Sequence, residues 1–135
     1  MTTAQPAGAQ LVLVVDDELL VQELMQAALE DGGFAVQTAS SDDEAIAALE
    51  KSGPAFAAVV TDVNLGRPGA GWNVARRARE LNATIPVLFV TGDSEHEWTV
   101  NGVPGSAILP KPFAPAQLVV AVATLINSAA SSLSS

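Results

Sequence analysis

Five short apolar runs alternate with longer helical patterns along this chain, and this alternation restricts its fold more than any other feature of the sequence. The first run is continuous and rich in β-branched residues, which is typical of a strand buried on both faces of a sheet. Strands are predicted over 11–15, 34–38, 56–61, 85–90 and 107–109. Helices are predicted from 17 to the glycines at 32 and 33, from the cap at 41 to a stop near 53–54, and over 72–82, 95–100 and 115–126.

Repeated strand–helix alternation predicts an α/β fold with a parallel sheet. Right-handed crossovers between parallel strands place helices on both faces of that sheet. No linker is long enough to separate two domains, so we expect one domain over 10–127. The segments 1–9 and 128–135 are predicted to be flexible tails.

Two local patterns support the helix assignments. Ser41 with Glu44 three residues later has the form of a capping box at a helix start. The first helix carries an apolar stripe that consists of Leu20, Leu24, Ala27 and Ala28.

Charge and composition exclude several classes of function. The chain has 135 residues and a net charge of −9, with six Lys plus Arg against fifteen Asp plus Glu, too few basic groups for a nucleic-acid partner. It has no cysteine, which excludes disulfides and thiolate metal sites. No apolar run approaches the ~20 residues of a membrane span, and the N-terminus lacks a signal-peptide pattern. We therefore expect a cytoplasmic protein without a membrane partner.

Polar residues stand where the predicted strands end, at Asp16, Asp17, Asp62, Thr91 and Lys111. In open parallel sheets the carboxyl ends of the strands meet at one edge, so these side chains should converge. Three close carboxylates repel one another unless a cation neutralises them. Oxygen ligands of this kind suit Mg²⁺, which binds through a few carboxylates and phosphate oxygens. A carboxylate beside Mg²⁺ and a lysine is a plausible nucleophile for phosphoryl transfer.

These strand-end residues lie in segments that resemble the receiver domain of bacterial two-component response regulators, of the stand-alone, chemotaxis-regulator-like type. The resemblance covers about 10–127, and no single segment is specific, but all four occur in order at receiver-like spacing. They are 14–18, 59–65, 90–92 and 109–113. The resemblance implies a flavodoxin-like fold, an open, doubly wound, five-stranded parallel sheet in the order 2-1-3-4-5.

The resemblance also implies the acceptor and its metal ligands. Asp62 would be the phospho-acceptor. Asp16, Asp17, Asp62 and the backbone carbonyl of Asn64 would hold Mg²⁺, for which Mn²⁺ or Ca²⁺ could substitute. Aspartate-dependent phosphatases share such a nucleophile, but they usually carry a second, acidic residue where this chain has Asn64.

Further roles follow from the same resemblance. Thr91 would be the switch hydroxyl that moves toward the phosphoryl group, and Lys111 would contact that group directly. The Lys111–Pro112 peptide bond would be cis. The side chains of Asn64 and Asp93 would tune how fast the aspartyl phosphate is lost.

The chain departs from the family pattern in two places. Many receivers have an aromatic residue three positions before the lysine, whereas this chain has Ile108 there and no tyrosine anywhere. The stretch 92–106 is also compressed and contains Gly102, Pro104 and Gly105. We therefore expect a short fourth helix and a readout that does not depend on aromatic rotation.

The expected function is a phospho-switch, relay or phosphate sink that takes its phosphoryl group from a histidine kinase or a histidine phosphotransfer protein. It would catalyse only its own phosphorylation and dephosphorylation, act as a monomer or weak homodimer, and carry no output domain. Three alternatives stay open: a degenerate receiver used as a binding module, an aspartate-dependent phosphatase, and a flavodoxin-like nucleotide binder. The acidic stretch 16–18 disfavours the last, because it would repel a phosphate.

Other conspicuous residues have simpler interpretations. His96, between two glutamates, is expected to be an exposed residue without a functional role. Trp72 and Trp98 are expected to pack against the core. The cluster of Arg76, Arg77 and Arg79 is expected to form the solvated face of one helix.

Overall fold

The computed structural model describes residues 8–92 and 97–134. Its strands form one five-stranded sheet in the order β2-β1-β3-β4-β5, and all adjacent strands run parallel. This confirms the predicted fold class and strand order. In chain order the elements are β1 (Leu11–Val15), α1 (Leu19–Asp31), β2 (Ala35–Ala39), α2 (Asp42–Ser52), the 3₁₀ turn η1 (Gly53–Ala55), β3 (Phe56–Asp62), α3 (Ala70–Leu81), β4 (Val87–Thr91), α4 (Trp98–Asn101), β5 (Ala107–Pro110) and α5 (Pro115–Ser134).

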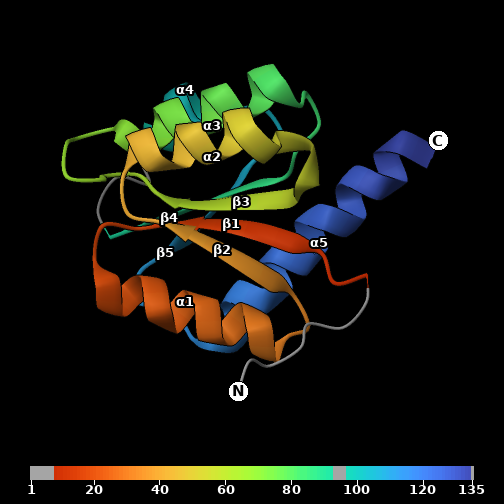
Figure 1. Ribbon diagram of the computed structural model, residues 1–135, viewed down its shortest axis with the longest axis horizontal. Helices are drawn as coiled ribbons and strands as arrows, with labels where there is room; N and C mark the ends of the chain where they lie inside the picture. Colours follow the sequence, from red (N-terminus) through yellow and green to blue (C-terminus); the bar gives the residue numbers. More distant parts are fainter. Residues whose placement is uncertain (1–7, 93–96, 135) are drawn as a thin grey trace.

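The sheet is the middle layer of three. Helices α2, α3 and α4 lie on one side of it, and α1 and α5 lie on the other (Figure 1). The continuous apolar runs explain this arrangement, because alternate residues of a strand point to opposite faces. In β1, Leu13 and Val15 join the core beneath α2 and α3, whereas Val12 and Val14 join the core above α1 and α5. A strand with a polar face could not support both cores.

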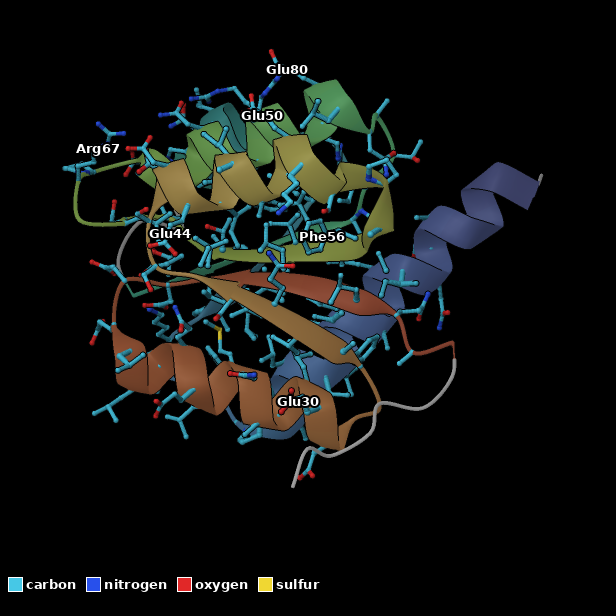
Figure 2. The ribbon with its side chains drawn as sticks, viewed as in Figure 1. Glu30, Glu44, Glu50, Phe56, Arg67 and Glu80 are labelled. Carbon is cyan, nitrogen blue, oxygen red and sulfur yellow. The ribbon has the colours of Figure 1, made fainter. Side chains whose placement is uncertain are left out.

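Helix α2 begins as the sequence predicts. The Ser41 hydroxyl accepts a hydrogen bond from the backbone N–H of Glu44 at 3.1 Å, and the Glu44 carboxylate accepts one from the backbone N–H of Ser40 at 3.3 Å. On the outer side of α2 and α3, Arg77 pairs with Glu50 at 2.9 Å and Glu80 at 3.2 Å, and Figure 2 shows these two acids near each other. This arginine therefore lies on a solvated helix face, as predicted.

Helix α1 presents a different face to the core from the one its apolar stripe predicts. Leu20 is 75% exposed and Leu24 is 67% exposed. Of the predicted stripe only Ala28 is buried, and the helix otherwise buries Met25, Leu29 and the amide of Gln22. Apolar residues occur on two sides of this helix at similar spacing, so periodicity alone does not select the buried one. The buried side is the one that carries Gln22, whose amide hydrogen-bonds to residues outside the helix.

The remaining differences concern the ends of helices. α3 begins at Ala70, two residues before the predicted start, and α5 continues to Ser134, past the predicted end near Ile126. α4 is only four residues long, in keeping with the compressed segment before β5. Within 8–92 and 97–134, no helix is both long and apolar enough to span a membrane.

Both tryptophans pack as predicted. Trp72 is 4% exposed and meets Phe89 edge to face, with the ring centroids 4.6 Å apart. Trp98 is half-buried against the same core, and its indole N–H donates to the Ser106 hydroxyl at 2.9 Å. His96 lies outside the described residues.

Candidate functional site

Three carboxylates meet at the carboxyl edge of the sheet. Asp16 and Asp17 directly follow β1, and Asp62 is the last residue of β3, the strand paired with β1. Each of the three offers an oxygen, and these oxygens lie within 4.8 Å of one another. Asp16 is fully buried, Asp62 is 7% exposed, and Asp17 is open to solvent. The topology thus brings these three residues together although 46 positions (62 minus 16) separate the first from the last.

Lys111 joins this cluster from the segment after β5. Its ammonium lies 3.1 Å from an oxygen of Asp16 and 3.1 Å from an oxygen of Asp62. The backbone of Lys111 is held as well, since its N–H donates to the carbonyl of Thr91 at 2.7 Å, and the Lys111–Pro112 peptide bond is cis. The lysine side chain, 20% exposed, therefore bridges two acids.

The cluster remains acidic despite its lysine. Burial raises the pKa of Asp62, and the nearby charge of Asp16 raises it further, while the Lys111 ammonium opposes both effects without cancelling them. For Lys111, burial would lower the pKa, but the carboxylates of Asp62 and Asp16 outweigh burial and raise it. The lysine thus stays charged near neutral pH, and three ionised carboxylates with one ammonium would carry two excess negative charges. A divalent cation would neutralise them.

The loop after β3 borders the same site. The backbone N–H of Asn64 donates to an oxygen of Asp62 at 3.3 Å, and its side-chain oxygen accepts from the N–H of Gly69 at 3.0 Å. A pocket of about 450 Å³ opens here, lined by Asp17, Glu18, Asp62, Asn64, Gly92 and Lys111. Its lining offers oxygen ligands and one ammonium group, a donor set suited to a hard cation and a phosphoryl group.

The other predicted site residues lie at β4 and β5. Thr91 ends β4 and is fully buried, opposite Pro110 of β5. Ile108 is half-buried in β5, where it pairs with Phe89. Asp93 lies outside the described residues. The structure therefore places Thr91 beside the strand that leads to Lys111.

Two polar contacts of buried groups were not predicted from the sequence. Gln22 of α1 is buried and donates hydrogen bonds to the carbonyls of Asp16 and Ala39. Arg67, in the loop after β3, pairs with the buried carboxylate of Asp42, which lowers the pKa of that acid. In Figure 2, Arg67 lies at the same end of the molecule as Glu44 in the first turn of α2. A glutamine in an amphipathic helix carries no sequence signal that separates a buried amide from an exposed one.

An open parallel α/β sheet with three carboxylates and a lysine at its carboxyl edge defines a class of phospho-acceptor domains. Residues 12–123 match the family model described as the response regulator receiver domain, and the chain belongs to that family. Phosphorylation-based signalling in two-component systems is the family's general function. Receiver domains bind Mg²⁺ through acidic residues, are phosphorylated by histidine kinases, and are generally not enzymes.

Individual relatives agree with this assignment. The chain is 34% identical over 122 residues to the transcriptional regulatory protein ResD of Bacillus subtilis, which covers 87% of this chain and 48% of ResD. It therefore spans about half the length of such curated relatives. A receiver protein of Sinorhizobium medicae is 41% identical with a TM-score of 0.86, covering 91% of this chain and 98% of that one. The chemotaxis regulator CheY4 of Vibrio cholerae is 26% identical with a TM-score of 0.75, covering 87% and 98%.

Proposed function

We propose that this chain is a phospho-acceptor whose Asp62 takes a phosphoryl group from a phosphohistidine. The observation that carries this proposal is the position of Lys111, which bridges Asp16 and Asp62 while Asp17 stays open to solvent. In the reaction an oxygen of Asp62 attacks phosphorus, the phosphorus–nitrogen bond breaks, and the imidazole leaves with the bonding electrons. The product is an acyl phosphate on Asp62.

The acidic cluster fits a magnesium ion. Asp16, Asp17, Asp62 and the backbone carbonyl of Asn64 would hold it, and Mn²⁺ or Ca²⁺ could occupy the same oxygen ligands. When bound, the ion supplies positive charge that offsets the repulsion between the carboxylates and the incoming phosphoryl oxygens. The surplus of two negative charges around Asp62 supports this part of the proposal.

Lys111 and Thr91 are proposed to respond to the new phosphoryl group. The Lys111 ammonium already lies 3.1 Å from Asp62, so it would pair with a phosphoryl oxygen after a small movement. Thr91 is linked to Lys111 because its carbonyl accepts a hydrogen bond from the backbone N–H of Lys111. A shift of the Thr91 hydroxyl would therefore also displace the ends of β4 and β5. Because position 108 holds isoleucine, we propose that this shift reaches partners through the α4–β5 segment without an aromatic rotation.

The phospho-donor is proposed to dock beside the site, on α1. Leu19, Leu20 and Leu24 are 62%, 75% and 67% exposed, and we call them the α1 apolar face. A groove of about 540 Å³ adjoins this face, lined by Val21, Leu24, Ala28, Lys111, Pro112, Phe113 and Pro115. Lys111 lines both this groove and the acidic pocket. A donor helix seated on the α1 apolar face would therefore hold its phosphohistidine close to Asp62, which is why we assign this surface to the histidine kinase or phosphotransfer protein.

The test is phosphotransfer from a purified, phosphorylated kinase in the presence of Mg²⁺. We expect one phosphoryl group per chain on the wild type and none on Asp62→Asn. Repeated hydrolysis of a phosphomonoester by the wild type would instead favour a phosphatase. We propose residues 10–127 as the unit that is sufficient for this transfer.

A further inference from the structure

Gln22 is a buried amide at a position where α1 otherwise presents apolar side chains to the core. It is 6% exposed, and the buried residues Met25 and Leu29 follow it one and two turns further along the same helix. Burying an amide is unfavourable unless hydrogen bonds replace those it made to water. The partners of this amide therefore indicate what the residue does.

The Gln22 amide nitrogen has three acceptors, none of them in its own helix. It lies 3.1 Å from the carbonyl oxygen of Asp16, 3.0 Å from that of Ala39, and 3.1 Å from the hydroxyl of Ser40. Asp16 follows β1, whereas Ala39 ends β2 and Ser40 follows it. One side chain thus ties the loop that carries two of the clustered acids to the neighbouring strand.

Asp16 itself is held at several atoms. Its backbone N–H donates to the Ala39 carbonyl at 3.2 Å, one carboxylate oxygen accepts from the N–H of Glu18 at 2.9 Å, and the other faces Lys111. Gln22 restrains the carbonyl of Asp16, which belongs to the peptide bond between Asp16 and Asp17. The repulsion between the carboxylates would spread this loop if the restraint were removed, because the acids are held closer than their charges favour.

We propose that Gln22 is a positioning residue that holds the Asp16–Asp17 loop in the conformation that binds the divalent cation. The inference rests on the proposed function, in which this cluster takes up Mg²⁺. Groups that orient metal ligands without touching the metal commonly change metal affinity by about 10–100-fold. Gln22 acts on the backbone of a ligand rather than on its carboxylate, so an effect near the lower end of that range is expected.

The test is calorimetric titration of Mg²⁺ into the unphosphorylated full chain, with no phospho-donor present. Gln22→Met keeps the length and most of the volume of the side chain but cannot donate a hydrogen bond. We expect its dissociation constant for Mg²⁺ to rise about tenfold relative to the wild type. The matched control is Gln26→Met on the same helix, whose amide donates to the exposed carboxylate of Glu30 at 3.4 Å, and it should bind Mg²⁺ as the wild type does.

A melting curve without Mg²⁺ separates positioning from plain packing. If Gln22→Met melts at a lower temperature but binds Mg²⁺ with the wild-type dissociation constant, the residue is structural and the inference is wrong. Should the methionine variant fail to melt cooperatively, Gln22→Asn, whose shorter amide cannot span the same acceptors, is expected to show the same loss of affinity. A wild type that binds no Mg²⁺ would overturn the metal site itself, and the inference with it.

Discussion

Gly71 lies directly against the backbone of Asp62. A Cβ atom at position 71 would be 2.0 Å from the carbonyl oxygen of Asp62 and 2.7 Å from the Cα of Val63. The Gly71 N–H also donates to the Val63 carbonyl at 2.7 Å. The first turn of α3 is therefore in close contact with the end of β3, and the absence of a side chain at position 71 is part of what places Asp62.

Replacing Gly71 with alanine should displace the acceptor strand. Neither atom that the new methyl group meets belongs to a flexible side chain, so the backbone must move, at a cost of about 3 kcal/mol in unfolding free energy. Urea denaturation measures this loss. Gly53→Ala is the control, because its Cβ would meet nothing closer than 3.9 Å and should change stability little. A Gly71→Ala protein as stable as the wild type would contradict the close approach.

Asp62→Asn should be more stable than the wild type at neutral pH without Mg²⁺. Because the folded protein raises the pKa of Asp62, mainly by burial, the folded state binds this proton more readily than the unfolded chain. The wild type therefore loses stability as the pH rises from the pKa of Asp62 in the unfolded chain through its higher pKa in the folded protein. The asparagine variant has no such group to titrate and does not lose this stability. Melting temperatures from acidic to neutral pH should diverge in favour of Asp62→Asn. A wild type that melts higher near neutral pH would refute the raised pKa.

Lys111→Met should destabilise the protein without Mg²⁺ and respond strongly to added Mg²⁺. Folding raises the pKa of Lys111, so its contribution to stability is complete at any pH below the pKa of lysine in the unfolded chain. That contribution is lost only when the pH rises through the higher pKa of the folded protein. At neutral pH the variant leaves Asp16 and Asp62 without their shared cation, at a cost of about 2 kcal/mol for this partly exposed group. Denaturant titrations with and without Mg²⁺ measure the loss and its recovery. The exposed Lys51→Met is the control, and an equal loss in both variants would argue against the bridge.

Changing the α1 apolar face should separate two phosphorylation reactions. Leu20→Gln with Leu24→Gln removes apolar surface that is exposed in the free chain, so stability should change by less than about 0.5 kcal/mol for each substitution. Labelling by acetyl phosphate should be unchanged, while transfer from a phosphorylated kinase should slow by about tenfold or more. Val120→Gln, on the exposed side of α5, is the comparison. Equal transfer rates for the wild type, the double leucine variant and Val120→Gln would place the docking site of the donor elsewhere.

The sequence predicts most of the fold because its strands are continuous apolar runs and its site residues stand where those runs end. Strand β1 has the predicted bounds, and the order of the sheet follows from the family resemblance. The buried face of α1 could not be predicted in the same way, since Leu20 and Leu24 lie on a stripe as regular as the one that is buried. The buried face also carries Gln22, whose hydrogen-bond partners lie in other elements and are not visible in the sequence.

The same reason explains which parts of the site could not be inferred. The convergence of Asp16, Asp62 and Lys111 follows from their places at strand ends, because the topology of an open sheet brings these ends together. Gln22 and Gly71 act through contacts with backbone atoms outside their own helices. Such contacts leave no periodic pattern, so only the folded structure identifies them.

The central claim is that Asp62 accepts the phosphoryl group, and mass spectrometry of the intact chain tests it most directly. After incubation with acetyl phosphate and Mg²⁺, the wild type should gain the mass of one phosphoryl group in a form that hydroxylamine removes, and peptide mapping should place it on Asp62. Asp62→Asn should gain nothing under the same conditions, and the wild type should gain nothing when the cation is chelated. Undiminished labelling of Asp62→Asn, or a modified peptide that does not contain Asp62, would contradict the account.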